Sequence, residues 1–172
     1  MERFRRFKIR IVLKSSIIIL CLTLVSCNFE TPTRFSEAAL NDVFTSFEGN
    51  EVSFKTILES HNSKTILINV WATWCKDCIE DFPVEKALQQ EFPNVSFVFL
   101  SLDRSEAAWK RGIKKYDLKG DHYFMKSGSD GPFWDFLNSN WTPRYLVVDQ
   151  KGNIKLFKAK SATDSRINEA LK

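Results

Sequence analysis

The stretch Leu67-Ile-Asn-Val-Trp-Ala-Thr-Trp-Cys-Lys-Asp-Cys78 decides the fold of this chain. Its first half is mostly apolar, as in a strand that is buried on both faces of a sheet. Its second half ends in Cys75 and Cys78, and a stretch with helical periodicity follows at once. The sequence therefore predicts that a central strand delivers a C-x-x-C pair to the first turn of a helix.

This position of the pair has a chemical consequence. The first helical turn carries unpaired N–H groups and the positive end of the helix dipole, so a thiolate is stabilised there. We therefore expect Cys75 to ionise readily and to act as the nucleophile. Cys78 lies one turn later, so the two cysteines can alternate between dithiol and disulfide through a mixed disulfide with another thiol. In such a cycle Cys78 would be the resolving cysteine.

A structural zinc site is the alternative for a C-x-x-C pair. Such a site needs two further ligands at suitable spacing. The chain has no second C-x-x-C, and its only histidines, His61 and His122, stand far apart and alone. We expect no metal, and no cofactor beyond the redox-active Cys75–Cys78 pair itself.

Three motifs resemble one family. Trp71–Cys78 resembles the active site of the thioredoxin superfamily, and Asn69–Cys75 is most similar to its TlpA-like, extracytoplasmic branch. Pro83 resembles the proline that kinks the active-site helix of this family, and Thr142-Pro143 resembles its cis-proline loop. The resemblance extends from about residue 35 to the C-terminus. It implies a thioredoxin fold and thiol–disulfide oxidoreductase activity.

The first 26 residues have the layout of a secretory signal, with a basic run followed by the short apolar Ile17–Val25. Residues 24–27, Leu-Val-Ser-Cys, resemble a bacterial lipobox, which implies cleavage before Cys27 and a lipid on its sulfur. The alternative is an uncleaved signal anchor that would bury Lys14 in the bilayer at a cost. Either interpretation places the rest of the chain outside the cytoplasm, tethered to a bacterial membrane.

The basic excess of the chain belongs to this N-terminal segment. The formal net charge is +4, yet from position 27 onward 19 basic residues stand against 20 acidic ones. A nucleic-acid-binding protein would carry a basic patch on its folded domain. We therefore expect no nucleic-acid partner.

Three segments are expected: a lipoprotein signal peptide (1–26), a tether (27–36) and a thioredoxin-like domain (37–172). An ordered extension near Phe35 is the alternative to a free tether. The domain pattern predicts a central mixed β-sheet flanked by helices on both faces, with an N-terminal β-hairpin extension and a right-handed β-α-β unit. Strands are expected at 43–47, 52–54, 65–71, 95–100, 122–125, 145–148 and 154–157, and helices at 54–60 and 76–92, after Ser105, near Pro132 and after Thr163 or Asp164.

Other residues around the pair are candidates for binding substrate. Trp74 is expected to form an apolar lip, with simple packing as the alternative. By family resemblance Pro143 is cis and lies against the disulfide, and the Thr142 backbone pairs with substrate like an added strand. That loop should hold Trp141 near Cys75.

The sequence offers two candidates for the acid–base group of the pair. Asn69 stands six residues before Cys75, where many cytoplasmic thioredoxins carry a buried Asp, and Asn cannot titrate. TlpA-like relatives often use a carboxylate after the pair, so Glu80 and Asp81 are the candidates. Asp81 lies one helical turn past Cys78 and matches the family position. The alternative is a solvated acid that merely suits the helix dipole.

These features predict a membrane-tethered thiol–disulfide oxidoreductase. A reductase of exported proteins is favoured because Lys76 and Asp77, rather than a His, separate the cysteines. Its expected partners are protein dithiol or disulfide substrates and an integral-membrane electron donor, and we expect a monomer. One alternative is a thiol peroxidase, although Ile68 and Ala72 occupy the Pro and Thr positions of that motif. The other is a non-enzymatic lipoprotein that keeps the fold for binding.

Overall fold

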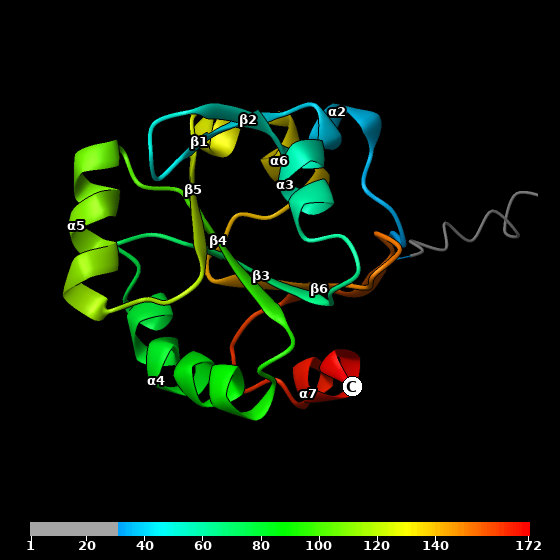
Figure 1. Ribbon diagram of the computed structural model, residues 1–172. Coiled ribbons are helices and arrows are strands. Elements are labelled where there is room, and N and C mark those ends of the chain that lie inside the picture. The colour runs from blue at the N-terminus through cyan, green and yellow to red at the C-terminus, as the bar shows by residue number, and fades with distance from the viewer. Residues whose placement is uncertain (1–30) are drawn as a thin grey trace, which may run out of the picture. The chain divides into compact units, whose positions relative to one another are not determined.

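Strands from both halves of the chain form one mixed sheet in the computed structural model, which describes residues 31–172 (Figure 1). Within this part of the chain the strand order is β2-β1-β5-β4-β3-β6-β7. The strands are β1 (Val43–Ser46), β2 (Glu51–Ser53), β3 (Ile66–Trp71), β4 (Ser96–Ser101), β5 (Asp121–Met125), β6 (Arg144–Val148) and β7 (Ile154–Ala159).

The central strand β3 runs parallel to β4 and antiparallel to β6. All six of its residues are buried, as the apolar run predicts for a strand covered on both faces. In the observed register Asn69 lies between Phe99 of β4 and Tyr145 of β6. The expected parallel β-α-β unit is therefore present, and it places the end of β3 beside the start of the next helix.

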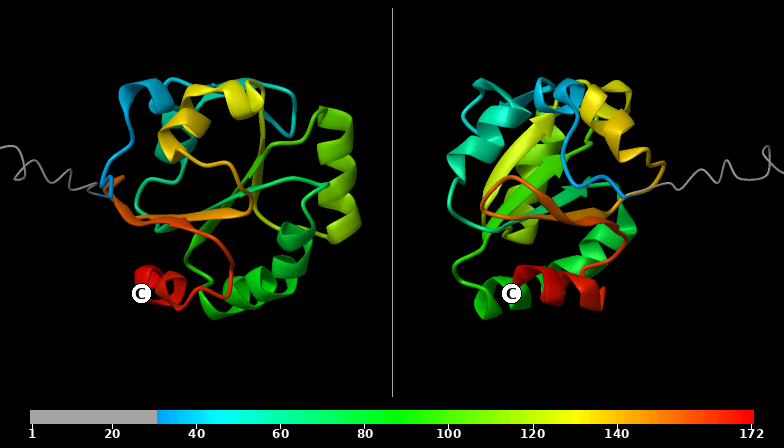
Figure 2. Two further views of the ribbon diagram at one scale, coloured as in Figure 1. Left: turned by 180° about the vertical axis from the view of Figure 1, so that it is seen from behind. Right: turned by 90° about the vertical axis from the view of Figure 1, so that its right-hand side faces the viewer.

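Helices cover both faces of the sheet, with α4 and α7 on one side and α2, α3 and α6 on the other (Figures 1 and 2). The side chains of β3 point to the two faces of the sheet in turn. Leu67 and Trp71 belong to the hydrophobic core on one face, and Ile68 and Val70 belong to the core on the other. The helices are α2 (Glu37–Leu40), α3 (Phe54–Ser60), α4 (Lys76–Glu91), α5 (Glu106–Tyr116), α6 (Pro132–Leu137) and α7 (Ser165–Leu171), with a 3₁₀ turn η1 (Gly128–Asp130) before α6.

The caps explain where the helices begin. The side chain of Ser105 accepts from Ala108 N at the start of α5, and Asp164 accepts from Arg166 N at the start of α7. Asp164 rather than Thr163 is therefore the cap of the closing helix. The thioredoxin fold and the elements expected from the sequence are confirmed, with ends that differ by one or two residues.

The chain is already docked before α2. Thr33 O accepts a hydrogen bond of 2.8 Å from Ile154 N, and Phe35 is buried with its ring 4.8 Å from that of Phe54. The ordered alternative for this segment therefore holds from Thr33 onward. The predicted signal peptide, lipobox and first part of the tether lie outside the described residues.

No helix within residues 31–172 combines the length and the apolar character needed to cross a membrane.

Candidate active site

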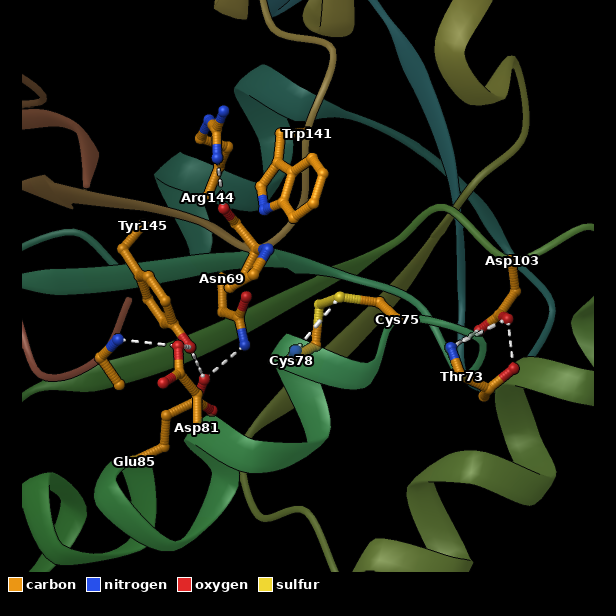
Figure 3. Close-up of a disulfide and its surroundings, with 12 residues drawn as sticks. Asn69, Thr73, Cys75, Cys78, Asp81, Glu85, Asp103, Trp141, Arg144 and Tyr145 are labelled. Carbon is orange, nitrogen blue, oxygen red and sulfur yellow. Dashed lines mark hydrogen bonds between the residues drawn. A yellow bond between two sulfur atoms is a disulfide. The ribbon is translucent and has the colours of Figure 1, made fainter. Parts of the chain in front are cut away.

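Cys75 and Cys78 form a disulfide at the N-terminus of α4, with an S–S distance of 2.04 Å (Figure 3). Cys75 is the N-cap of the helix, and its sulfur accepts a hydrogen bond of 3.1 Å from Cys78 N. Cys75 is 6% exposed, whereas Cys78 is fully buried. Of the two cysteines, only Cys75 retains contact with solvent. A backbone N–H group already points at its sulfur, where it would stabilise a thiolate.

The loop that delivers Cys75 is fixed by Asp103, which follows β4. Asp103 is buried, and it accepts hydrogen bonds from Thr73 N at 3.1 and 3.2 Å, from Thr73 Oγ1 at 2.5 Å and from Ser101 Oγ at 2.9 Å. α5 packs against the same loop through Gly112, where an added Cβ would lie 2.3 Å from Thr73 Cγ2. Neither residue stands out in the sequence beyond its place, Asp103 after a strand and Gly112 inside a helix.

The Thr142–Pro143 peptide bond is cis, as expected from the resemblance. It lies directly before β6, and Arg144 donates a hydrogen bond of 2.8 Å from Nη1 to Pro143 O. The Arg144 side chain has no acidic partner within the described residues, and burial lowers its pKa. Thr142 itself is buried at the edge of the groove described next.

A groove with a volume of about 900 Å³ opens beside the disulfide. Cys75, Trp74, Trp141 and Thr142 line it on the side of the cysteine pair, and residues 124–130 contribute to its lining from β5 and η1. Trp74 is 61% exposed and Trp141 is 55% exposed. Simple packing therefore does not account for either indole. Cys75, Thr142 of the cis-proline loop and both tryptophans therefore meet at this groove.

The two predicted carboxylates lie in different surroundings. Glu80 points to solvent and forms an ion pair of 3.3 Å with Lys76. Asp81 is buried, and it accepts from Ser161 Oγ at 2.9 Å and from Ala162 N at 2.8 Å. The alternative of a solvated acid is therefore wrong for Asp81, which ties α4 to the loop before α7.

Glu85 is a buried carboxyl group that the sequence pattern does not single out. Tyr145 Oη lies 2.5 Å from Glu85 Oε1 and 3.1 Å from Asp81 Oδ2, and Asn69 Nδ2 donates to Glu85 Oε1 at 2.5 Å (Figure 3). Burial raises the pKa of Glu85 to about 8, and the Asp81 charge acts in the same direction. Burial, followed by the Glu85 charge, raises the pKa of Tyr145 well above 10. The only signal in the sequence was an acid on the inward face of the active-site helix.

Comparisons with known proteins agree with this geometry. The thioredoxin-like family model matches residues 62–154. Thioredoxin-like protein YneN of Bacillus subtilis is 28% identical over 121 residues, which cover 68% of this chain and 69% of that protein. Thiol-disulfide oxidoreductase ResA of Bacillus thuringiensis is 26% identical over 145 residues, covering 83% of this chain and 80% of ResA.

A solved structure gives the same result. The solution structure of a thiol-disulfide oxidoreductase from Bacteroides vulgatus has 30% sequence identity and a TM-score of 0.64, and the match covers 86% of this chain and 91% of that one. The matched region contains the Cys75–Cys78 pair at the tip of α4. The chain therefore belongs to the thioredoxin-like family and is a thiol-disulfide oxidoreductase of the ResA and DsbE type.

Proposed function

We propose that this protein is a membrane-tethered disulfide reductase that acts on exported proteins. The observation that carries the proposal is the unequal access to the two sulfurs, since Cys75 borders an open groove while Cys78 is fully buried. A partner disulfide can meet Cys75 alone. Cys78 is then available only for the second, intramolecular step.

The reaction proceeds in two exchanges. The Cys75 thiolate attacks one sulfur of the substrate disulfide, so a mixed disulfide forms and the other substrate sulfur leaves as a thiol after taking up a proton. Cys78 loses its proton and attacks the Cys75 sulfur, which re-forms the Cys75–Cys78 disulfide and releases the second substrate thiol. The substrate gains two electrons, and the protein is reduced again by an external dithiol donor in the membrane.

The groove supplies the proposed substrate contacts. Trp74 and Trp141 offer exposed aromatic surface on the side of the cysteine pair, and aromatic side chains often dominate binding at protein interfaces. The backbone of Thr142 pairs with an extended substrate segment in the manner of an added strand, next to Pro143. A protein segment that carries a disulfide therefore fits the site better than a compact small molecule.

The proposed direction of the reaction rests on the two residues between the cysteines, which add no net positive charge beside the Cys75 sulfur. Lys76, the one cation between the cysteines, is paired with Glu80, and Asp77 in the first helical turn opposes a negative charge on sulfur. A reduced form with modest thiolate stabilisation corresponds to a reducing couple. This supports a reductase rather than an oxidase.

The proposed location rests on the N-terminal sequence. A signal peptide over 1–26 with cleavage before Cys27 would leave a lipid on that cysteine, and several acyl chains hold a protein stably on a membrane. The segment from Cys27 to Thr33, where the docked part of the chain begins, would be the free tether to a monomeric extracytoplasmic domain.

Trapping of mixed disulfides tests the proposal. The Cys78→Ser variant should accumulate covalent complexes with exported proteins through Cys75, because the resolving step is lost. The Cys75→Ser variant is the matched control and should trap none. Equal trapping by both variants, or none by either, would contradict the assignment of the two roles.

Further measurements separate the alternatives. A redox potential as high as that of the secretory oxidases, measured against glutathione, would overturn the reductase direction. Peroxide consumption that is lost in Cys75→Ser would favour a thiol peroxidase. A cellular phenotype that survives in both serine variants would favour a non-enzymatic binding protein.

A further inference from the structure

Glu85 lies on the same face of α4 as Cys78. The two residues are seven positions apart, which corresponds to two helical turns and about 10 Å along the helix axis. Figure 3 shows the Asn69 side chain between Cys78 and the carboxyl groups of Asp81 and Glu85. Cys78 and Asn69 are both buried on this side of the sheet. The carboxyl group and the resolving sulfur thus share one layer of the core, with a neutral amide between them.

The hydrogen bonds around Tyr145 indicate where a proton resides. Its single hydroxyl hydrogen can be donated to only one acceptor, yet its oxygen lies within hydrogen-bond distance of both Asp81 Oδ2 and Glu85 Oε1. The second contact is favourable only if one carboxyl group is protonated and donates to the Tyr145 oxygen. Both oxygens of Asp81 already accept a hydrogen bond, Oδ1 from Ser161 Oγ and Oδ2 from Ala162 N. Apart from the contact with Tyr145, Glu85 accepts one hydrogen bond, at Oε1 from Asn69 Nδ2, and its Oε2 accepts none. Glu85 is therefore the carboxyl group with room for the shared proton.

The surroundings of Glu85 favour its neutral form. Glu85 is 2% exposed, and its Oε2 is buried without a hydrogen-bond partner among the described residues. No Lys, Arg or His of residues 31–172 forms an ion pair with it. A buried charge without a counterion is costly. The upward shift of its pKa agrees with this geometry.

Few titratable groups face Glu85 from the elements packed around it. Asp81 does so from α4, and Tyr145 does so from β6. β3 contributes the uncharged Asn69. The buried residues of α7 are apolar, namely Ile167, Ala170 and Leu171.

We propose that Glu85 is a positioning residue that stores a proton for the redox couple, so that its ionisation is linked to the charge on Cys78. Glu85 is neutral while the disulfide is intact around neutral pH. In the reduced protein a negative charge on Cys78 disfavours ionised Glu85, and ionised Glu85 disfavours the Cys78 thiolate. The inference rests on the thiol–disulfide couple and not on the direction of the reaction or on the membrane tether.

The link appears when the disulfide is reduced. The thiolate of a dithiol donor attacks the Cys75 sulfur, the Cys75–Cys78 bond breaks, and Cys78 leaves as a thiolate. The second donor thiol then loses its proton and releases Cys75, so two electrons have passed to the protein and the donor has become a disulfide. At pH values above the pKa that Glu85 has in the oxidised protein, reduction makes Glu85 take up a proton. The reduced protein then holds more protons than its two cysteines would hold alone.

The experiment measures the redox potential of the full chain against glutathione from pH 6 to pH 9.5. Wild type and Glu85→Gln should have matching potentials near pH 6, where residue 85 is neutral in both. Above pH 8 the wild-type potential should fall more steeply, by up to a tenfold change in equilibrium constant per pH unit, or about 30 mV. The matched control is Glu91→Gln, at an exposed position on the same helix, and it should follow wild type. Parallel curves for wild type and Glu85→Gln would overturn the proposal.

A second measurement uses the wild-type protein, so it does not depend on whether a variant folds. The carboxyl carbon of Glu85 is titrated by NMR in the wild-type chain, once oxidised and once reduced. The midpoint should lie near 8 in the oxidised protein and higher in the reduced protein. The same midpoint in both states, or one near the ordinary value of 4.5, would refute the link. Absence of any exchange with glutathione would instead count against the oxidoreductase function itself.

Discussion

Asp103 accepts hydrogen bonds from both the backbone N–H and the hydroxyl group of Thr73, two residues before Cys75. A buried carboxylate at the end of one strand thereby fixes the loop that leaves the neighbouring strand. The position of Cys75 thus depends on a residue 28 positions later in the chain.

Replacing Asp103 by Ala should loosen this loop. The change leaves Thr73 N and Ser101 Oγ without their acceptor, so the free energy of unfolding should fall by about 2–3 kcal/mol. Disulfide exchange at Cys75 should slow as well, because its sulfur is held less well. Urea unfolding and the exchange rate measure the two effects. Thr73→Val is the matched control, since it removes only the hydroxyl group and should have the smaller effect on both. An equal loss in the two variants would contradict the role of the backbone contact.

Gly112 should tolerate no side chain while Thr73 is present. An added Cβ would lie 2.3 Å from Thr73 Cγ2 and 3.1 Å from the Trp71 ring, so Gly112→Ala should destabilise the protein by about 1–3 kcal/mol through overpacking. Thr73→Ser removes the clashing methyl group and keeps the hydroxyl. The double variant should therefore regain part of the loss in a double-mutant cycle. Strictly additive effects would show that the contact with Thr73 is not the cause.

Stability should depend on pH through Glu85. The unfolded chain releases this proton near pH 4.5, whereas the folded protein keeps it up to about pH 8. The folded state therefore binds more protons between these values, and its stability falls as pH rises through this window, by about 1.4 kcal/mol per pH unit at most. Glu85→Gln should remove this contribution, so its stability relative to wild type should improve by up to about 4 kcal/mol from pH 5 to pH 9.

Urea unfolding of both proteins at the two pH values gives this difference. Any cost of the substitution that does not depend on pH cancels in the comparison. If the free energies of unfolding of wild type and Glu85→Gln differed by the same amount at both pH values, Glu85 would be ionised in the folded protein from pH 5 to pH 9.

The two exposed tryptophans should matter for binding and not for folding. Trp74→Ala and Trp141→Ala should change the free energy of unfolding by less than about 0.5 kcal/mol, because neither indole is buried. For a protein disulfide, kcat/KM should fall about tenfold in each variant, whereas exchange with glutathione should change little. Phe47→Ala is the control, since Phe47 is a partly exposed aromatic that does not line the groove. Equal losses with both substrates would place the defect at the cysteine pair instead.

Much of the fold was predictable because its signals are local. The apolar run into Cys75 and Cys78 identifies the central strand and the active-site helix, and the hairpin around Gly49 and the cap residue Ser105 follow equally short patterns. The cis bond at Pro143 followed from family resemblance rather than from any local rule. These features need at most a few neighbouring residues to be recognised.

The network behind the pair was not predictable in this way. Asp81, Glu85, Tyr145 and Asn69 come from three elements that meet only in the folded sheet. In the sequence Glu85 looks like any other acidic residue of a charged helix. Only its burial in the folded protein distinguishes it. The sequence predicts Asp81 near the pair, but its partners Ser161 and Ala162 lie 80 and 81 residues away.

Because Cys78 is completely buried, the rate of the second step of the proposed cycle is a property of the protein alone. In the proposed cycle a bound client is released by Cys78, which outside molecules do not contact. This release is an intramolecular step, so it follows first-order kinetics and does not depend on the concentration of other molecules. The lifetime of the mixed disulfide in this cycle is thus set by the protein. A substitution in the core behind the pair would lengthen or shorten that lifetime without altering which clients bind.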